Sequence, residues 1–329
     1  MAPHPQRLTV SHRAWPLKAA RGGEIAADVV LVEISDNDSR GRGECVPMRR
    51  FGESADSVVA ALNAMKGAVS SGLHRETLQQ AMPPGAARNA LDCAFWAIDA
   101  DRAYINVAEL AGVGAVKPVV TAFTLGFDTP AAMAELAGAH RTRPLFKLEL
   151  GGDGDMDRVQ AVRQAAPAAR LIVDAQARWT APQLAAFMPI LLDLRVELIE
   201  QPLPADADDA LAGLASPIPL CADESCRIAA DLDRIAGKYA AIAIGLDKMG
   251  GLTEALAIAA EAKRRGLRIA IGGEIGTSLG VAPALLVAQG AEFIALDGPL
   301  HLASDRASGL RYDGSTVHPA DPKLWGGPG

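Results

Sequence analysis

The chain has 329 residues, of which 50% are hydrophobic and 22% charged, and 32 Lys and Arg against 39 Asp and Glu give a net charge of −7 at pH 7. This composition is typical of a globular protein with about two domains, or with one barrel and an appended domain. It shows neither the basic stripe of a nucleic-acid-binding protein nor an apolar run of about 18 residues that could span a membrane. The first residues contain no apolar segment typical of a secretion signal, and the 4 cysteines form no C-x-x-C pair. We therefore expect a cytoplasmic protein with buried thiols that binds a small molecule, and neither nucleic acid nor membrane.

Residues 1–115 are predicted to form one α+β domain. Val29–Ile34 has the composition of a strand, and the polar, glycine-containing segment Ser35–Gly43 after it indicates a turn. Two helical stretches follow, Ser54–Ser71 and Ala86–Ala103. Strands followed by helices favour a compact α+β unit.

Residues 116–304 have a different pattern, in which short apolar runs alternate with stretches of helical length such as Met156–Ala165, Ala181–Leu191 and Thr253–Arg265. The eight runs are Thr121–Leu125, Leu145–Leu150, Leu171–Asp174, Val196–Glu200, Pro219–Asp223, Ala241–Ile244, Arg268–Ile271 and Phe293–Leu296. Eight strand–helix units predict an α/β fold, a (β/α)8-type barrel. The alternative is a doubly wound sheet, but no G-x-G-x-x-G follows any of the runs. The tail, about 305–329, is expected to pack back on the first domain.

Three consecutive runs end in an acidic residue, namely Asp174, Glu200 and Asp223. In a barrel the carboxyl ends of the strands meet at one rim, where the chemistry of such proteins takes place. Three carboxylates on neighbouring rigid strands, with room left for water and substrate, are suitable ligands for Mg²⁺. The alternative is that each acid only caps the helix that follows it.

The glycine-rich segment Gly272–Gly280 follows the seventh run, at a position where barrels often bind phosphate. It contains Glu274. Two interpretations remain open: a contact with the ligand, or a plain connecting loop.

Several segments together resemble one known family. They are GECVPMRRFGES (Gly43–Ser54), RNALDCAFWAID (Arg88–Asp99), IEQPL (Ile199–Leu203), CADES (Cys221–Ser225) and LDKMGGLTEAL (Leu246–Leu256). In these segments the chain resembles the muconate-lactonizing subgroup of the enolase superfamily, and within that subgroup the L-Ala-D/L-Glu (dipeptide) epimerases. The resemblance implies a modified TIM barrel with an α+β capping domain, and Mg²⁺ on Asp174, Glu200 and Asp223. It also implies a dipeptide or acylated amino acid as substrate, with a homo-oligomer possible.

Enzymes of this family remove a proton α to a carboxylate and return it to either face. Two lysines on opposite sides of the substrate act as base and acid. The resemblance places the first at the second lysine of a K-x-K, which here reads Lys147-Leu148-Glu149. The second belongs at the first lysine of a K-L-D-K, where this chain has Gly245. Both lysine positions are therefore substituted, while Lys147 is retained.

The resemblance also suggests substrate-binding residues. Arg21 matches a capping-loop arginine that receives the distal carboxylate of the substrate. Of the two aspartates that hold the ammonium group of the dipeptide, this chain has Ala295 and Asp297, so only Asp297 remains.

Three hypotheses about function follow. The first is a Mg²⁺-dependent, epimerase-like isomerase that is impaired or altered, with Glu149 as an unconventional base and Glu274 across the cavity from it. The second is a catalytically silent or repurposed protein that binds a metal and a ligand on the same fold. The third is a lyase that needs only one base.

Overall fold

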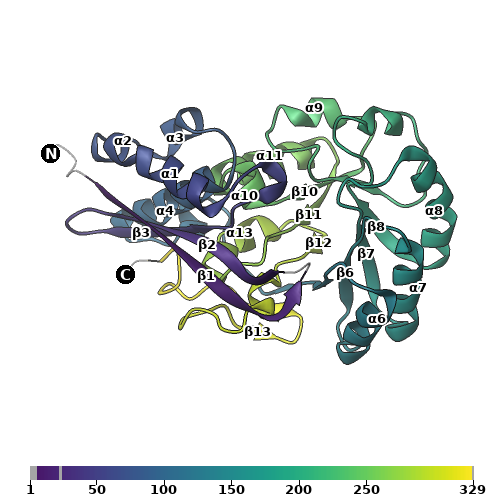
Figure 1. Ribbon diagram of the computed structural model, residues 1–329. Helices are drawn as coiled ribbons and strands as arrows, with labels where there is room; N and C mark the ends of the chain where they lie inside the picture. Colours follow the sequence, from purple (N-terminus) through teal and green to yellow (C-terminus); the bar gives the residue numbers. More distant parts are fainter. Residues whose placement is uncertain (1–5, 22–23, 328–329) are drawn as a thin grey trace.

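The computed structural model describes residues 6–21 and 24–327, and for Ala20, Arg21 and Glu24 it describes the backbone alone. Two parts lie next to each other in Figure 1, an N-terminal sheet with helices and a larger barrel. No helix within the described ranges is long and apolar enough to cross a membrane. The four cysteines are free and buried, which confirms the expectation of buried thiols.

The N-terminal part is built on an antiparallel sheet of β1 (Arg7–Arg21), β2 (Glu24–Ser35) and β3 (Arg40–Cys45), in that order. The prediction of a turn over Ser35–Gly43 was wrong at its end, because β3 begins at Arg40. The glycines in this segment serve close packing: a Cβ on Gly41 would lie 2.1 Å from the carbonyl oxygen of Ala94, and one on Gly43 would lie 2.0 Å from that of Ala90. They allow β3 to press against a helix.

That helix, α4, spans Ala86–Ala103 as predicted, and nearly all of its side chains are buried. The predicted helix over Ser54–Ser71 is divided into α1 (Ala55–Ala64) and α2 (Lys66–Ser70). At the break, the N–H of Met65 donates to the carbonyl of Leu62 at 3.1 Å, a tighter turn than that of an α-helix. The other helices here are α3 (Arg75–Ala81) and α5 (Val107–Leu110).

The barrel is an eight-stranded parallel sheet in the order β12-β11-β10-β9-β8-β7-β6-β5. Each strand coincides with one of the eight predicted runs, which confirms the predicted fold class. The strands are β5 (Phe123–Leu125), β6 (Leu145–Glu149), β7 (Arg170–Asp174), β8 (Val196–Glu200), β9 (Leu220–Ala222), β10 (Ala241–Ile244), β11 (Arg268–Ile271) and β12 (Phe293–Ile294). The helices between and after them are α6 (Pro130–Ala139), α7 (Asp155–Ala165), α8 (Ala181–Asp193), α9 (Asp231–Ile235), α10 (Leu246–Met249), α11 (Leu252–Arg264), α12 (Ser278–Val281) and α13 (Ala284–Ala288).

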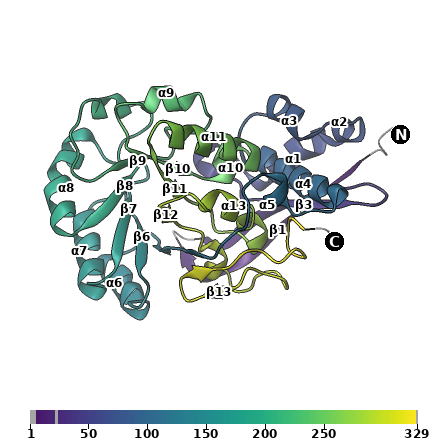
Figure 2. The ribbon, with the colours of Figure 1, turned by 180° about the vertical axis from the view of Figure 1, so that it is seen from behind.

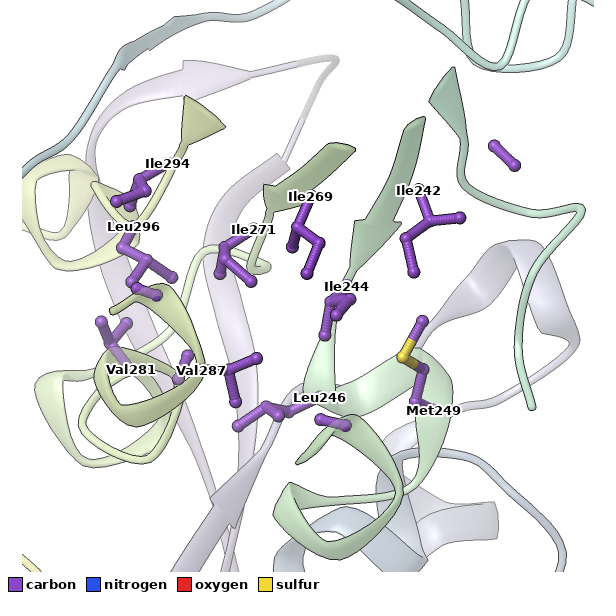
Figure 3. Close-up of a cluster of buried hydrophobic side chains, with 14 of the residues drawn as sticks. Ile242, Ile244, Leu246, Met249, Ile269, Ile271, Val281, Val287, Ile294 and Leu296 are labelled. Carbon is purple, nitrogen blue, oxygen red and sulfur yellow. The ribbon is translucent and has the colours of Figure 1, made fainter. Parts of the chain in front are cut away.

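The barrel closes where the N–H of Ala122, just before β5, donates to the carbonyl of Ile294 in β12 at 2.6 Å. Side chains alternate along each strand, so that one set faces the axis and the next faces the surrounding helices. In β10 the outward set is Ile242 and Ile244, which lie in the core of Figure 3 together with Ile269 and Ile271 of β11. The inward set is small, for example Ala241 and Ala243, which leaves space along the axis.

The C-terminal segment returns to the N-terminal part. Strand β13 (Tyr312–Asp313) pairs with β14 (Thr316–Val317), and β14 pairs with β4 (Val119–Val120). Further on, the indole N–H of Trp325 donates to the carbonyl of Cys93 in α4, and Arg42 in β3 donates to the carbonyls of Lys323 and Leu324. Figure 2 shows this end of the chain beside α4 and β3. The boundary between residues 115 and 116 stays a prediction.

Candidate active site

One cavity of about 370 Å³ opens at the carboxyl ends of the barrel strands. It is lined by every residue that we predicted for the site except Arg21, whose side chain lies outside what the structure describes. The predicted residues in its lining are Lys147, Glu149, Asp174, Glu200, Asp223, Gly245, Glu274 and Asp297. The strands therefore bring together side chains that are far apart in the sequence.

The register of the parallel sheet sets three carboxylates at one level. Glu149, the last residue of β6, pairs with Asp174 of β7, and Asp174 pairs with Glu200 of β8. Glu200 in turn pairs with Cys221, so Asp223 stands two residues beyond it, just after β9. Both Asp174 and Glu200 are 4% exposed. Four acids thus end four adjacent strands.

Lys147 lies below Glu149 on the same strand and places its ammonium group between two of these acids. Its Nζ is 3.0 Å from Oδ2 of Asp174 and 2.8 Å from Oε1 of Glu200. Burial by itself would lower the pKa of Lys147, but the charges of Asp174, Glu200 and Asp223 outweigh it and raise that pKa well above its usual value. The three acids therefore favour the charged form of Lys147.

Two other cationic side chains contact Asp223. Nζ of Lys248, in α10, lies 2.7 Å from its Oδ1, and Nη1 of Arg50 lies 3.4 Å from its Oδ2. Burial would raise the pKa of Asp223, but Lys248, Arg50 and Lys147 together lower it to about 2. Arg50 also reaches Glu224 at 3.0 Å and Glu274 at 3.7 Å. This arginine connects a capping-domain loop to two different barrel loops.

The donor set suits a hard divalent cation such as Mg²⁺. Asp174, Glu200 and Asp223 offer only oxygen ligands, and Asp174 and Glu200 already point one oxygen each at a common positive charge. Burial and the neighbouring Asp174 and Asp223 raise the pKa of Glu200 in spite of Lys147, so the site is short of positive charge. Within the described residues, no three His, Cys, Asp or Glu side chains are grouped closely enough to bind a metal as they stand. Asp223 would have to turn from Lys248 toward the other two.

Gly245 lies across the barrel from Glu149. In the sheet order, β6 and β10 are separated by β7, β8 and β9 on one side and by β11, β12 and β5 on the other. Gly245 has an ordinary extended backbone, φ −125° and ψ 124°, and a Cβ built on it would meet nothing closer than 3.9 Å. The backbone does not require glycine here, and the space for a larger side chain is open.

Asp297 lines the cavity, but its oxygens are already engaged. The backbone N–H of Thr124 donates to its Oδ2 at 2.6 Å, the Thr124 hydroxyl to its Oδ1 at 2.9 Å, and Nε2 of His301 lies 2.8 Å from Oδ2. Burial would raise the pKa of Asp297, but these partners outweigh it and lower that pKa. Its carboxylate is thus permanently charged and is satisfied inside the protein.

Sequence reasoning missed two kinds of residue. Arg50 and Lys248 hold Asp223, and both lie inside the motifs that carried the resemblance, so the motif positions were the only available signal. Gln201, with a left-handed φ of 35°, accepts hydrogen bonds on Oε1 from the N–H groups of Asp223 and Ser225. It fixes the start of the loop that carries Asp223, and its place in the IEQPL segment was the only signal in the sequence.

Comparison with known proteins agrees with this architecture. Residues 131–319 match the family described as "Enolase C-terminal domain-like", and residues 6–112 match the "Mandelate racemase / muconate lactonizing enzyme, N-terminal domain". The L-Ala-D/L-Glu epimerase of Escherichia coli (strain K12) is 42% identical, over 94% of this chain and 99% of that protein. The N-acetyl-D-glutamate racemase of Pseudoalteromonas sp is 39% identical, over 91% and 95% of the two chains.

A solved structure is also similar over nearly its full length. It is an enolase family member from Agrobacterium tumefaciens with homology to dipeptide epimerases, holding sodium and L-Ala-L-Glu. It is 45% identical with a TM-score of 0.95, and the match covers 98% of this chain and 100% of that one. This chain therefore belongs to the mandelate racemase/muconate lactonizing enzyme family of the enolase superfamily, and it is an isomerase-type enzyme similar to the dipeptide epimerases.

Proposed function

We propose that this protein acts on the proton α to the carboxylate of an N-acylated acidic amino acid, a class that includes L-Ala-L-Glu. Mg²⁺ would be held by Asp174, Glu200 and Asp223. The observation that carries the proposal is the shared cavity, in which this triad, Lys147 and Glu149 lie at the ends of adjacent strands. The activities of the Escherichia coli and Pseudoalteromonas relatives support the same substrate class.

An α-proton next to a carboxylate is a very weak acid, so its removal needs strong stabilisation of the enediolate. A bound Mg²⁺ supplies this by drawing negative charge onto the substrate carboxylate. Lys147, whose Nζ contacts Asp174 and Glu200, brings a cationic side chain to the same end of the cavity. Arg50 and Arg178 line the cavity too and are suited to a second carboxylate of the substrate.

At the positions of the two expected lysines, this site carries a side chain on one face only. Glu149 is on β6 and can take the α-proton from one face of the substrate, whereas at the β10 face Gly245 brings no side chain. A carboxylate is also a weaker base beside a divalent cation than it is in water, because the cation stabilises its charged form. We therefore expect exchange of the α-proton on one face, with epimerisation far slower than exchange.

The substrate is best described as acylated at nitrogen. Within this class, a substrate without a free ammonium group is favoured, because Ala295 has no acidic group and three hydrogen bonds within the protein already engage the oxygens of Asp297. An N-acyl group brings no charge to that end of the cavity.

The test is exchange in D₂O with Mg²⁺, using N-acetyl-L-glutamate, N-acetyl-D-glutamate and L-Ala-L-Glu and following the α-proton by NMR. The expected result is deuterium at the α-carbon of one glutamate isomer, lost in Glu149→Gln. Binding without exchange of either isomer would instead show a catalytically silent binding protein. Elimination of a substrate group would show a lyase.

A further inference from the structure

Asp247 is a second acidic residue on the face of the cavity that Gly245 leaves without a side chain. It lies two residues after Gly245, in α10, and lines the same cavity. Because β10 is across the barrel from β6, Asp247 and Glu149 approach the cavity from opposite sides.

One oxygen of Asp247 is anchored and the other is available. Nδ2 of Asn89 donates to Oδ1 at 2.7 Å, and the backbone N–H of Val46 donates to the same atom at 3.2 Å. No hydrogen bond or ion pair from the described residues reaches Oδ2. Oδ2 has no such partner, yet it is not one of the buried side-chain atoms without a hydrogen bond. This oxygen is therefore accessible to solvent. The carboxyl group is thus fixed in orientation by the capping domain and leaves one oxygen for a ligand.

The surroundings of Asp247 favour its neutral form. Burial raises its pKa well above the ordinary value, and the negative charges of Glu274 and Glu53 add to that rise, against the hydrogen bonds from Asn89 and Val46. The nearby Lys248 directs its ammonium group at Asp223 and at the carbonyl of Ala243. A protonated carboxyl group can donate a proton, which is what a charged carboxylate such as Asp297 cannot do.

We propose that Asp247 is the general acid for the second face of the substrate, where position 245 offers no side chain. This proposal rests on the proposed function. Glu149 accepts the α-proton, and the electron pair of the broken C–H bond moves into the enediolate. The Oδ2–H of Asp247 then gives its proton to the α-carbon from the opposite face, which re-forms a C–H bond with inverted configuration. Glu149 afterwards loses one proton to water and Asp247 regains one, so no proton is gained or lost overall.

This arrangement makes the two isomers unequal. The isomer whose α-proton faces Glu149 meets the residue that accepts this proton and exchanges fast. The other isomer needs Asp247 as a base, and the burial and negative neighbours that raise the pKa of Asp247 favour its protonated form, so exchange and inversion from that side are slow. The two exchange rates therefore report separately on the two residues.

The experiment measures α-proton exchange in D₂O for N-acetyl-L-glutamate and N-acetyl-D-glutamate separately, together with their interconversion. Asp247→Asn keeps an oxygen for Asn89 and Val46 but removes the acid. We expect the slow exchange and the interconversion to fall about 100-fold, with a much smaller fall in the fast exchange. Glu149→Gln should lower the fast exchange. If Asp247→Asn does not fold, Asp247→Ser serves with the same expected result.

The matched control is Asp92→Asn, another buried aspartate that joins α4 to the barrel but does not line the cavity. It should leave the ratio of the two exchange rates unchanged. An unchanged ratio in Asp247→Asn, or the same change in both variants, would overturn the role of Asp247. Absence of exchange with either isomer in the unaltered protein would overturn the proposed function itself, so the two failures are distinguishable.

Discussion

In the proposed function, Glu149 and Gly245 each alter proton transfer at one face of the substrate. A lysine close to cations is easily neutral near pH 7, because desolvation and positive neighbours lower its pKa, and it then serves as a base. A glutamate in the same surroundings is held in its charged form and gives up basicity. Gly245 removes the group on the other face, although the open space at its Cα would accept one.

Lysines at both positions should therefore restore transfer on two faces. We predict that Glu149→Lys with Gly245→Lys raises epimerisation of N-acetylglutamate by at least about 100-fold, since a positioned acid–base group contributes about 10²–10⁴-fold. Either single change should speed α-proton exchange on one face only. Chiral chromatography measures the inversion, and NMR in D₂O measures the exchange. Fast epimerisation by the unaltered protein, lost in Glu149→Gln, would contradict this prediction.

Asp297 allows a prediction about the nitrogen end of the substrate. Because Thr124 and His301 already satisfy its oxygens, it has little to offer an ammonium group. We expect N-acetyl-L-Ala-L-Glu to bind at least as tightly as L-Ala-L-Glu in calorimetry. The matched comparison is Ala295→Asp, which adds an acid and should favour the free amine, within the ~1.5–3 kcal/mol of a charged hydrogen bond. A clear preference of the unaltered protein for the free amine would show that Asp297 does hold it.

At the scale of elements, helix α4 connects the capping domain to the barrel through a buried polar face. Arg88 donates to the carbonyls of Met249 and Gly250 at the end of α10. Asp92 accepts from the N–H and the hydroxyl of Thr253 in α11, and from Gln79 in α3. These contacts explain why a helix so rich in alanine carries Arg88, Asn89 and Asp92 at buried positions.

Asp92 should make the stability of the protein depend on pH. Burial raises its pKa from 3.8 to about 6, against its hydrogen bonds to Thr253 and Gln79. The folded state therefore holds this proton to a higher pH than the unfolded state does, and the free energy of unfolding falls as pH rises from about 4 to about 6. At ~1.4 kcal/mol per pKa unit the loss is at most about 3 kcal/mol. Asp92→Asn lacks this loss. In urea unfolding, the free energy of unfolding of the variant, relative to that of the unaltered protein, should therefore be higher at pH 7 than at pH 4.

A control with the opposite sign is Asp36→Asn. Burial raises the pKa of Asp36, but Arg102 and the N–H groups of Asp38 and Ser39 together outweigh it and lower that pKa. Its contribution to stability is present above its unfolded pKa and is lost as the pH falls. Parallel stability curves for Asp92→Asn and the unaltered protein would show that folding does not shift the pKa of Asp92.

The strands were predictable from the sequence because each apolar run is short and is followed by a helix-length stretch. The acids Asp174 and Glu200 could be placed together for the same reason, since parallel neighbours share one register. The break at Met65 was not predictable, because the apolar spacing continues through it. Nor was the ion pair of Arg50 with Asp223, which depends on how a loop of the capping domain meets the barrel. Contacts within the sheet follow from local pattern, and contacts between the two parts do not.

At the scale of the whole molecule, the two parts enclose a cavity in which carboxylates outnumber cations. Lys147, Lys248 and Arg50 each contact at least one carboxylate of the triad, yet Glu200 and Glu224 still have raised pKa values: burial raises both, and the charge of Asp223 adds to it. Negative charge held so close together opposes folding. A divalent cation that binds only the folded protein would relieve it, and the gain in stability would follow from mass action.

Mg²⁺ should therefore stabilise the folded chain, by about 2.7 kcal/mol at a concentration 100 times its dissociation constant. Scanning calorimetry with Mg²⁺ and with EDTA measures the difference as a shift in melting temperature. Asp223→Asn should abolish the shift, because it removes one of the three carboxylates that would hold the metal. Asp297→Asn changes a carboxylate that lies in the same cavity but is not part of the triad. This variant should keep the Mg²⁺-dependent rise in melting temperature, even if its own melting temperature is lower than that of the unaltered protein. Identical melting of the unaltered protein in Mg²⁺ and in EDTA would mean that Lys147, Lys248 and Arg50 already neutralise the triad, and that the site works without a divalent cation or not at all.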